Sequence, residues 1–320
     1  MHKRLVNNCT LDISLIPQGP ILIKSGREGA DPTKPDMEFV ETYHAGDRTI
    51  YLPGSSIKGA LRAHAERIVR TIGTDQRPRA LETSSDTLWA SDPLDHKGYA
   101  YLEKEQNSQK VYKWSSFTDQ LFGSVVIASR FRIEDAYPVD PQQIKTEERN
   151  GVAIDRVFGS VAVGPFNYQV CTAGEFRTKI HLKNFTLEQL GLIGLVLRDL
   201  SDGWFGIGFA KSRGMGLVEV KLNEATVDYP GCVLKGEKIR LLGGALEWPQ
   251  TMLIGAGAFL QDAERAEYGF PADDIQDTSI TAEEMAYGLG VRLRWPESQV
   301  GDLFTLAVSA WRQRLERVAA

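Results

Sequence analysis

Hydrophobic and polar positions alternate in some stretches of the chain and follow a helical period in others. Residues 10–25 alternate and predict a first strand with an extension, and residues 49–52 predict a second, short strand. Apolar residues then recur at helical spacing over residues 57–72. This pattern predicts an amphipathic helix with Ser55 or Ser56 as its N-cap.

A similar order follows further along the chain. Strand patterns occur over residues 125–136 and 175–182. The pattern Thr-x-x-Gln at residues 186–189 is a capping box, and it begins a predicted helix over residues 187–200. A last strand is predicted at residues 217–220. The order strand, helix, strand, strand, helix, strand predicts an α+β fold with a modified ferredoxin-like (RRM-like) core.

The other segments are predicted additions to that core. Residues 74–120 are polar and irregular and predict an insertion, and residues 138–170 predict a loop and hairpin punctuated by glycines. We therefore expect a first domain over residues 1–229 and a C-terminal extension over residues 230–320. The extension ends in a predicted helix whose apolar residues keep core spacing from 300 to 318.

Composition indicates an ordinary globular protein. Of 320 residues, 42% are hydrophobic and 25% are charged, and no run of about 18 apolar residues predicts a membrane span. Three widely spaced cysteines give neither a disulfide framework nor a zinc-binding spacing. The first residues lack the apolar segment of a secretion signal. We expect a cytoplasmic protein with no membrane partner.

Charge is distributed unevenly along the chain. The net charge is −5, yet residues 48–70 carry five basic side chains against one acidic, and residues 255–290 carry eight acidic against one basic. An acidic protein can bind a polyanion when its positive charge is concentrated on one face. The acidic stretch would repel RNA, so we expect it to form a surface for neighbouring subunits or a folded extension.

The tract at residues 53–62 (Pro-Gly-Ser-Ser-Ile-Lys-Gly-Ala-Leu-Arg) has the composition of a phosphate-binding site. It joins a short strand to a helix whose free N-terminal amides and positive dipole end can hold an anion. Its two basic residues lie four positions apart on one helix face. An ordinary helix start with solvated basic residues is the alternative. The candidate phosphate contacts are Ser55, Ser56, Lys58, Gly59 and Arg62.

A second tract, residues 203–216, contains five glycines in 14 residues. Glycines at this density permit positive φ angles and let backbone amides approach a ligand, and the aromatic residues of the tract offer stacking surfaces. The tract lacks the Gly-Lys-Ser/Thr ending of a P-loop and does not follow a strand, which disfavours nucleoside-triphosphate and dinucleotide sites. A flexible turn is the alternative. The candidate RNA contacts are Gly206, Gly208, Lys211, Arg213 and Gly214.

Taken in order along residues 10–222, these tracts resemble the RAMP proteins of CRISPR–Cas systems. The resemblance also includes Leu-Phe-Gly-Ser at 121–124 and Ser-Arg-Phe at 129–131, and it is strongest for the backbone subunit of type III effector complexes. It implies RNA-guided antiviral defence by a subunit that polymerises along a CRISPR guide RNA. The implied partners are the guide RNA, complementary target RNA, further copies or related RAMP subunits and other effector-complex subunits.

The resemblance also gives roles to particular segments. Residues 138–170 would form a thumb-like hairpin that kinks the guide–target duplex, with Phe158, Phe166 or Tyr168 as the wedge or, alternatively, as hairpin packing. Phosphate contacts would position the guide, and base pairing would supply specificity. Arg130 is a further candidate phosphate contact, with a surface arginine at a strand edge as the alternative.

In such subunits a loop aspartate cleaves the target RNA in a step that depends on a divalent metal. Asp36 matches it best and Asp31 second; Asp36 would hold a transient Mg²⁺ or Mn²⁺ or take the proton of a ribose 2′-hydroxyl. A solvated loop carboxylate is the alternative. His44 is another candidate base, whereas His64 lies near the buried stripe of its helix and is expected to be structural. The insertion contains His96 and no cysteine, so we predict no zinc.

Three functions follow from these observations. In the first, the chain is an endoribonuclease subunit that binds the guide and cuts the target. In the second, it is a non-catalytic RAMP subunit that binds the guide RNA. In the third, it processes precursor guide RNA, which would favour a histidine base.

Overall fold

A computed structural model describes residues 4–26, 35–80 and 87–319. Its centre is a seven-stranded sheet in the order β15-β16-β9-β1-β8-β4, with β5 also paired to β8. Every pairing in this sheet is antiparallel. The strands are β1 (Asn8–Pro17), β4 (Phe131–Ile133), β5 (Tyr137–Pro138), β8 (Phe176–Lys183), β9 (Val218–Tyr229), β15 (Glu283–Glu284) and β16 (Val291–Pro296).

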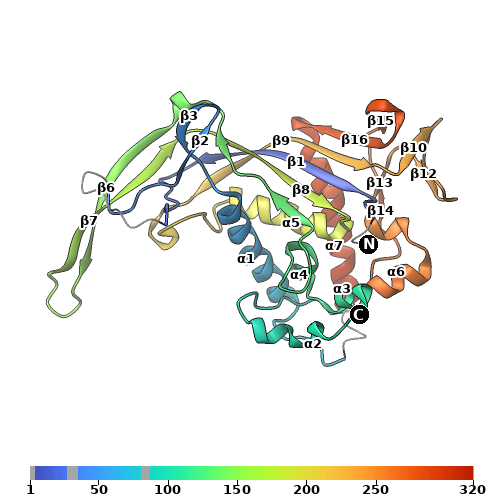
Figure 1. Ribbon diagram of the computed structural model, residues 1–320, viewed down its shortest axis with the longest axis horizontal. Coiled ribbons are helices and arrows are strands. Elements are labelled where there is room, and N and C mark those ends of the chain that lie inside the picture. Colours follow the sequence, from blue (N-terminus) through green and yellow to red (C-terminus); the bar gives the residue numbers. More distant parts are fainter. Residues whose placement is uncertain (1–3, 27–34, 81–86, 320) are drawn as a thin grey trace.

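The predicted α+β, ferredoxin-like core is confirmed. The order β1, α1 (Gly54–Ile72), β4, β8, α5 (Leu187–Ser201), β9 gives the spatial order β9-β1-β8-β4, as in a split βαβ fold. Figure 1 shows α1, α5 and α7 (Val300–Ala319) on one side of the sheet, with its other face uncovered over β1 and β8. The sheet therefore has one core face and one polar face.

Local patterns explain this layering. In β1, Cys9 and Leu11 are buried on the helix side, whereas Thr10 and Asp12 lie on the polar face. The buried residues of α1 recur at helical spacing, and the predicted capping box at the start of α5 is present.

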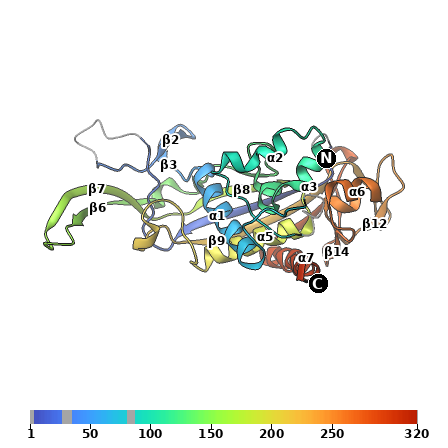
Figure 2. The same cartoon turned by 90° about the horizontal axis from the view of Figure 1, so that it is seen from below.

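The insertion forms a small helical layer beside α1. Figure 2 shows it, seen from below, on the side of the body away from α7. Its elements are η2 (His96–Tyr99), α2 (Ala100–Glu103), α3 (Ser108–Trp114) and α4 (Phe117–Phe122). The strand predicted over 125–136 is confined to the three residues of β4, because Gly123 takes a positive φ and Ser124 N donates to the Ile127 carbonyl oxygen in a turn.

Two hairpins project near the end of the sheet. β6 (Lys145–Ile154) and β7 (Val161–Ala173) form the long predicted hairpin, which extends away from the body in Figure 1. β2 (Glu41–His44) and β3 (Asp47–Ile50) form a short hairpin within a segment predicted largely as loop. Its two-residue turn at Ala45 and Gly46 has positive φ at both positions, a hairpin geometry that an Ala-Gly pair does not signal strongly.

The C-terminal extension is continuous with the core. β16 pairs with β9, and Trp295 and Trp311 lie buried in the same hydrophobic cluster as β1 and α1. The remaining elements are β10 (Cys232–Lys235), β11 (Lys238–Leu241), β12 (Glu247–Pro249), β13 (Met252–Ile254), α6 (Asp262–Tyr268), β14 (Ile275–Asp277) and the short turns η3 (Pro141–Gln143), η4 (Lys211–Arg213), η5 (Ala256–Phe259), η6 (Ala286–Gly288) and η7 (Glu297–Gln299).

Candidate nucleic-acid interface

The start of α1 borders a cavity of about 730 Å³ between this helix and strands β4 and β8, here called the basic cavity. Gly54 and Ser55 of the first helical turn line it together with five basic or titratable residues. These are Lys58, Arg130, Arg132, His181 and Lys183. Glu134 lies close to two of them, 3.3 Å from the Arg132 guanidinium and 2.8 Å from His181 Nε2. Positive charge therefore outweighs negative charge around the cavity.

Lys58 is held beside the basic cavity by the edge of β4. Its Nζ donates to Ser129 Oγ (2.9 Å) and to the Phe131 carbonyl oxygen (3.3 Å). Partial burial lowers the pKa of Lys58 below that of a free lysine, and the neighbouring Arg62 charge lowers it further. A bound phosphate would stabilise the ammonium form, because an opposite charge offsets both effects.

The expectation that Ser55 or Ser56 caps α1 is wrong. Pro53 occupies the N-cap position, and its side chain makes no capping hydrogen bond. The Gly54 amide donates instead to Asp135 Oδ1 at 2.7 Å. Both serines lie within the first helical turn, where Ser55 is exposed. A carboxylate of the protein therefore already satisfies one of the helix-end amides.

Gly59 lies on the exposed side of α1. A Cβ built at this position would meet no atom within 4 Å. Glycine in a helix interior costs roughly 1 kcal/mol relative to alanine, and no contact within the described protein requires it here. The absent side chain leaves the helix backbone open to an approaching ligand.

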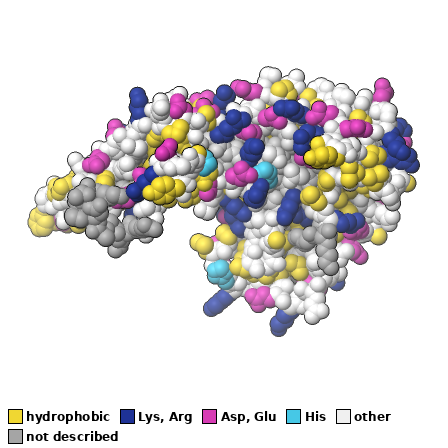
Figure 3. Space-filling model, turned by 45° about the horizontal axis from the view of Figure 1, so that its top comes forward, with side chains coloured by type: hydrophobic (Ala, Val, Ile, Leu, Met, Phe, Trp, Pro, Cys, Tyr) yellow, Lys and Arg dark blue, Asp and Glu magenta, His cyan; other side chains and the backbone are white. Residues whose placement is uncertain are grey.

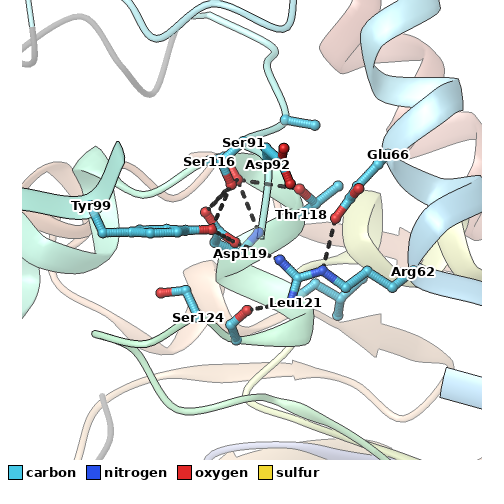
Figure 4. Close-up of polar contacts among 12 residues, drawn as sticks. Arg62, Glu66, Ser91, Asp92, Tyr99, Ser116, Thr118, Asp119, Leu121 and Ser124 are labelled. Carbon is cyan, nitrogen blue, oxygen red and sulfur yellow. Dashed lines mark hydrogen bonds and ion pairs between the residues drawn. The ribbon is translucent and has the colours of Figure 1, made fainter. Parts of the chain in front are cut away.

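Arg62 has a different role from the predicted phosphate contact. Its guanidinium binds Glu66 Oε1 (2.8 Å), Asp119 Oδ1 (2.8 Å) and the Gly123 carbonyl oxygen (2.7 Å), one partner for each nitrogen. Figure 4 shows this network, in which the fully buried Asp119 also accepts hydrogen bonds from the hydroxyls of the insertion. The Arg62 side chain is only 16% exposed, so it joins α1 to α4.

Arg130 is also used inside the protein. The residue is 4% exposed, and its Nη1 donates to the Asn184 carbonyl oxygen. The guanidinium stacks 4.0 Å from the Tyr112 ring centroid and 5.3 Å from that of Phe270. It therefore connects the insertion with the C-terminal extension, although the residue also lines the basic cavity.

The glycine-rich tract packs against the extension of β1. Phe209 N donates to the Leu22 carbonyl oxygen at 2.7 Å. Gly208 has φ +79°, and a Cβ there would overlap that same Leu22 carbonyl oxygen. A Cβ at Gly206 would overlap the carbonyl oxygen of Gly216, at the other end of the tract. These two glycines serve close internal packing. Gly214, also at positive φ, has open space around it and stays available to a ligand.

A second group of cations, here called the loop cluster, lies on this tract. Lys24 Nζ is 5.7 Å from the Phe209 ring centroid, and the Arg213 guanidinium is 5.2 Å from it. Lys211 is exposed in the same short turn, η4, as Arg213. The loop cluster thus combines three positive charges with an aromatic ring, the combination that single-stranded nucleic acid favours.

Asp36 lies beside the middle of β7 in the long hairpin. It is exposed, and its Oδ2 accepts a hydrogen bond from Asn167 N of β7 (2.9 Å). The neighbouring Met37 bridges to Tyr168 of the same strand. The other candidate, Asp31, lies outside the described residues.

Backbone hydrogen bonds join the loop cluster to the start of α1. The bonds run from Phe209 to Leu22, from Val40 to Ile23, from Tyr51 to Val40, and from Leu52 to Ala136. These four bonds link Phe209 to Ala136 through neighbouring backbone segments. Asp135, next in the chain, bonds the first amide of α1. The two glycine-containing tracts therefore belong to one layer of extended segments.

His64 gives a second contact between the tracts. It is buried, its Nε2 lies 2.8 Å from Asp199 Oδ2, and its ring stacks on Phe205 of the glycine-rich tract at 4.3 Å between centroids. This is the structural role that its place on the helix predicted.

The long hairpin ends in exposed apolar side chains. Phe158 is 84% exposed and Val157 82%, whereas Phe166 and Tyr168 lie nearer the base and contact each other. Figure 3 shows hydrophobic side chains at the tip of the arm and a concave outline between the arm and the body.

Sequence reasoning overlooked Arg132 and Lys183. Both are basic and lie on strands next to buried neighbours, and residues 177, 179, 181 and 183 of β8 form a basic series at every second position. This alternation of basic residues is the sequence signal from which an exposed basic strand face could have been predicted.

The described residues hold no group of three or more His, Cys, Asp or Glu side chains arranged for a metal ion. Within the described part of the chain, no helix is both long and apolar enough to cross a membrane.

The family model of the RAMP superfamily matches residues 17–219. No curated protein sequence matches the chain. The matched segment runs from the last residue of β1 to the second residue of β9, so it contains α1, β4, β8 and α5 of the core, the insertion, both hairpins and the glycine-rich tract.

Proposed function

The chain belongs to the RAMP superfamily, which is associated with RNA binding in CRISPR–Cas systems, and from this premise we propose that it is the backbone subunit of a type III effector complex. It binds CRISPR guide RNA and cleaves complementary target RNA. The observation that carries the proposal is the layer of extended segments that joins the loop cluster to α1 and its basic cavity, with Asp36 and the long hairpin at its border.

The guide strand runs from the loop cluster towards the basic cavity. Lys24, Lys211 and Arg213 contact phosphates at one end, and Lys58, Arg132 and Lys183 contact them at the other. Such contacts position the strand without reading its sequence, so specificity comes from pairing with the target. Gly59 lets a phosphate approach the backbone of α1 closely.

The hairpin tip supports a regular interruption of the guide–target duplex. Of the three wedge candidates, Phe158 is the exposed one, and apolar side chains unstack base pairs in other nucleic-acid complexes. A displaced target nucleotide can align its ribose 2′-hydroxyl with the adjacent phosphodiester.

Cleavage then requires a carboxylate near that hydroxyl. Asp36 takes the 2′-hydroxyl proton, the 2′-oxygen attacks the phosphorus, and the 5′-oxygen leaves with a proton from water. The products are a 2′,3′-cyclic phosphate and a 5′-hydroxyl. A Mg²⁺ or Mn²⁺ ion bound by Asp36 and the phosphate would supply charge neutralisation. Asp31 is the second candidate for the same role.

The test uses the full chain assembled with guide RNA and its partner subunits. Complementary RNA and Mg²⁺ are added, and the cutting rate of the unchanged protein is compared with those of Asp36→Asn and Asp31→Asn. The matched control is Asp47→Asn, which changes another exposed aspartate. Because the carboxamide oxygen in Asp36→Asn can still accept the hydrogen bond from the Asn167 backbone amide, we expect intact guide binding and a loss of cutting of about 100-fold or more.

Unchanged cutting in both aspartate variants would refute their catalytic role. No cutting by the unchanged complex would favour the non-catalytic RAMP subunit. Absence of guide RNA from the purified complex would refute the function altogether. Removing Lys58 and Lys183 tests binding separately, because each lost phosphate contact lowers the salt slope of log K by about 0.7.

A further inference from the structure

Three aromatic rings form a parallel stack between the loop cluster and the basic cavity. The His44 ring lies 3.7 Å from that of Tyr137 between centroids, with 8° between their planes. Tyr51 lies on the same Tyr137 ring, 5.8 Å away and tilted by 17°. We call this stack the aromatic ladder. Its members come from the tip of the short hairpin, from β5 and from the segment before α1.

The ladder is built into the layer that joins the two basic regions. Tyr51 N donates to the Val40 carbonyl oxygen, and Tyr137 follows Ala136, the last residue of that layer. Asp135, two residues before Tyr137, accepts the first amide of α1. The ladder is therefore fixed in place relative to the phosphate contacts proposed above.

One end of the ladder is open. Tyr137 is the middle ring and Tyr51 is half-buried, whereas His44 is exposed at the hairpin tip. Among the described residues, no second ring stacks on His44. The exposed face of the His44 ring is therefore the outer end of the ladder, on the surface that the RNA strand would cross.

We propose that this face of His44 is a stacking site for one unpaired RNA base, which becomes the fourth ring of the ladder. The proposal rests on the function proposed above and adds to it a contact made to a base. A flat heteroaromatic face accepts any of the four bases, since every base has a π face. The site therefore orients one nucleotide without reading its identity.

The experiment measures binding of the full chain to short single-stranded RNA in which one base is replaced by hydrogen. The missing base is moved through each position of a strand of about eight nucleotides, a length within the site sizes of single-strand binders that restricts alternative registers. In the unchanged protein we expect one position at which base removal weakens binding by about tenfold, the usual effect of losing one base–aromatic stack.

Variants assign that position to the ladder. His44→Ala should weaken binding to the intact strand and abolish the position dependence, and His44→Phe should restore both. Tyr43→Ala is the matched control, because Tyr43 is a 78% exposed aromatic residue of the same hairpin that lies outside the ladder. It should leave the profile unchanged.

The outcomes separate this inference from the proposed function. A flat profile, or one that His44→Ala leaves unchanged, would overturn the stacking site while RNA binding itself stands. If the unchanged protein binds no strand at any salt concentration, the proposed function fails first and the stacking site with it.

Discussion

Replacing Gly59 by alanine should stabilise the protein and weaken its binding to RNA. Alanine is favoured over glycine in a helix interior by about 0.8–1 kcal/mol. The new methyl group meets no atom within 4 Å, so no clash reduces this gain. For a chain of this size the melting temperature should rise by about 2 °C. The same methyl group would stand in the path of the phosphate that we propose to contact the α1 backbone, and loss of one charge-assisted hydrogen bond would weaken binding by about tenfold or more.

Thermal unfolding and a titration with fluorescent single-stranded RNA measure the two effects separately. Gly301→Ala is the matched control, because Gly301 is an exposed glycine of α7 with the same open surroundings. It should not lower RNA affinity. Stabilisation of the Gly59 variant with unchanged RNA affinity would refute the backbone contact, and destabilisation would refute the helix geometry.

Two further variants test the electrostatic assignments. Arg62→Met should lower the free energy of unfolding by about 3–5 kcal/mol, since it leaves the buried Asp119 carboxylate without its cation. The midpoint of urea unfolding should therefore fall. The salt slope of RNA binding should stay unchanged in this variant, whereas Lys183→Ala should reduce that slope. Asp12→Asn tests a pH effect: burial raises the pKa of Asp12, but hydrogen bonds from Arg177 and Asn223 and the Arg177 charge outweigh it, so the folded-state pKa is lowered. A lowered carboxylate pKa stabilises the protein above the unfolded value of about 3.9, and this stabilisation is lost as pH falls through the folded value. Because Arg177 is 54% exposed, the variant should lose about 1 kcal/mol or less at pH 7, and urea titrations should show the difference vanishing in acid.

The core elements were predictable because their signals are local. Period-two alternation in β1, helical spacing in α1 and the capping box of α5 each involve residues within a few positions of one another. The order of these elements was sufficient for the ferredoxin-like core. The hairpin over 138–170 followed from its glycines in the same way.

The roles of single basic residues were not predictable in this way. Arg62 pairs with Asp119, 57 positions away, and Arg130 stacks on one ring from the insertion and another from the extension. A basic residue on a helix or after a strand is compatible with solvent, a phosphate or a buried carboxylate. Only the packing of distant segments decides which of these partners the basic residue has. Lys183 of β8 differs, because the alternation of buried and exposed positions along its strand is enough to predict its exposure.

The C-terminal extension affects how the family segment can exist by itself. A polypeptide shortened to residues 17–219 would lose nearly all of β1 and β9, which would leave β8 with an unpaired edge where β1 now lies. It would also uncover α5, whose Gly191 and Gly194 fit closely against α7. Such a fragment would tend to associate through its bare edge and apolar helix, so limited proteolysis should not release the family segment as an autonomous folding unit.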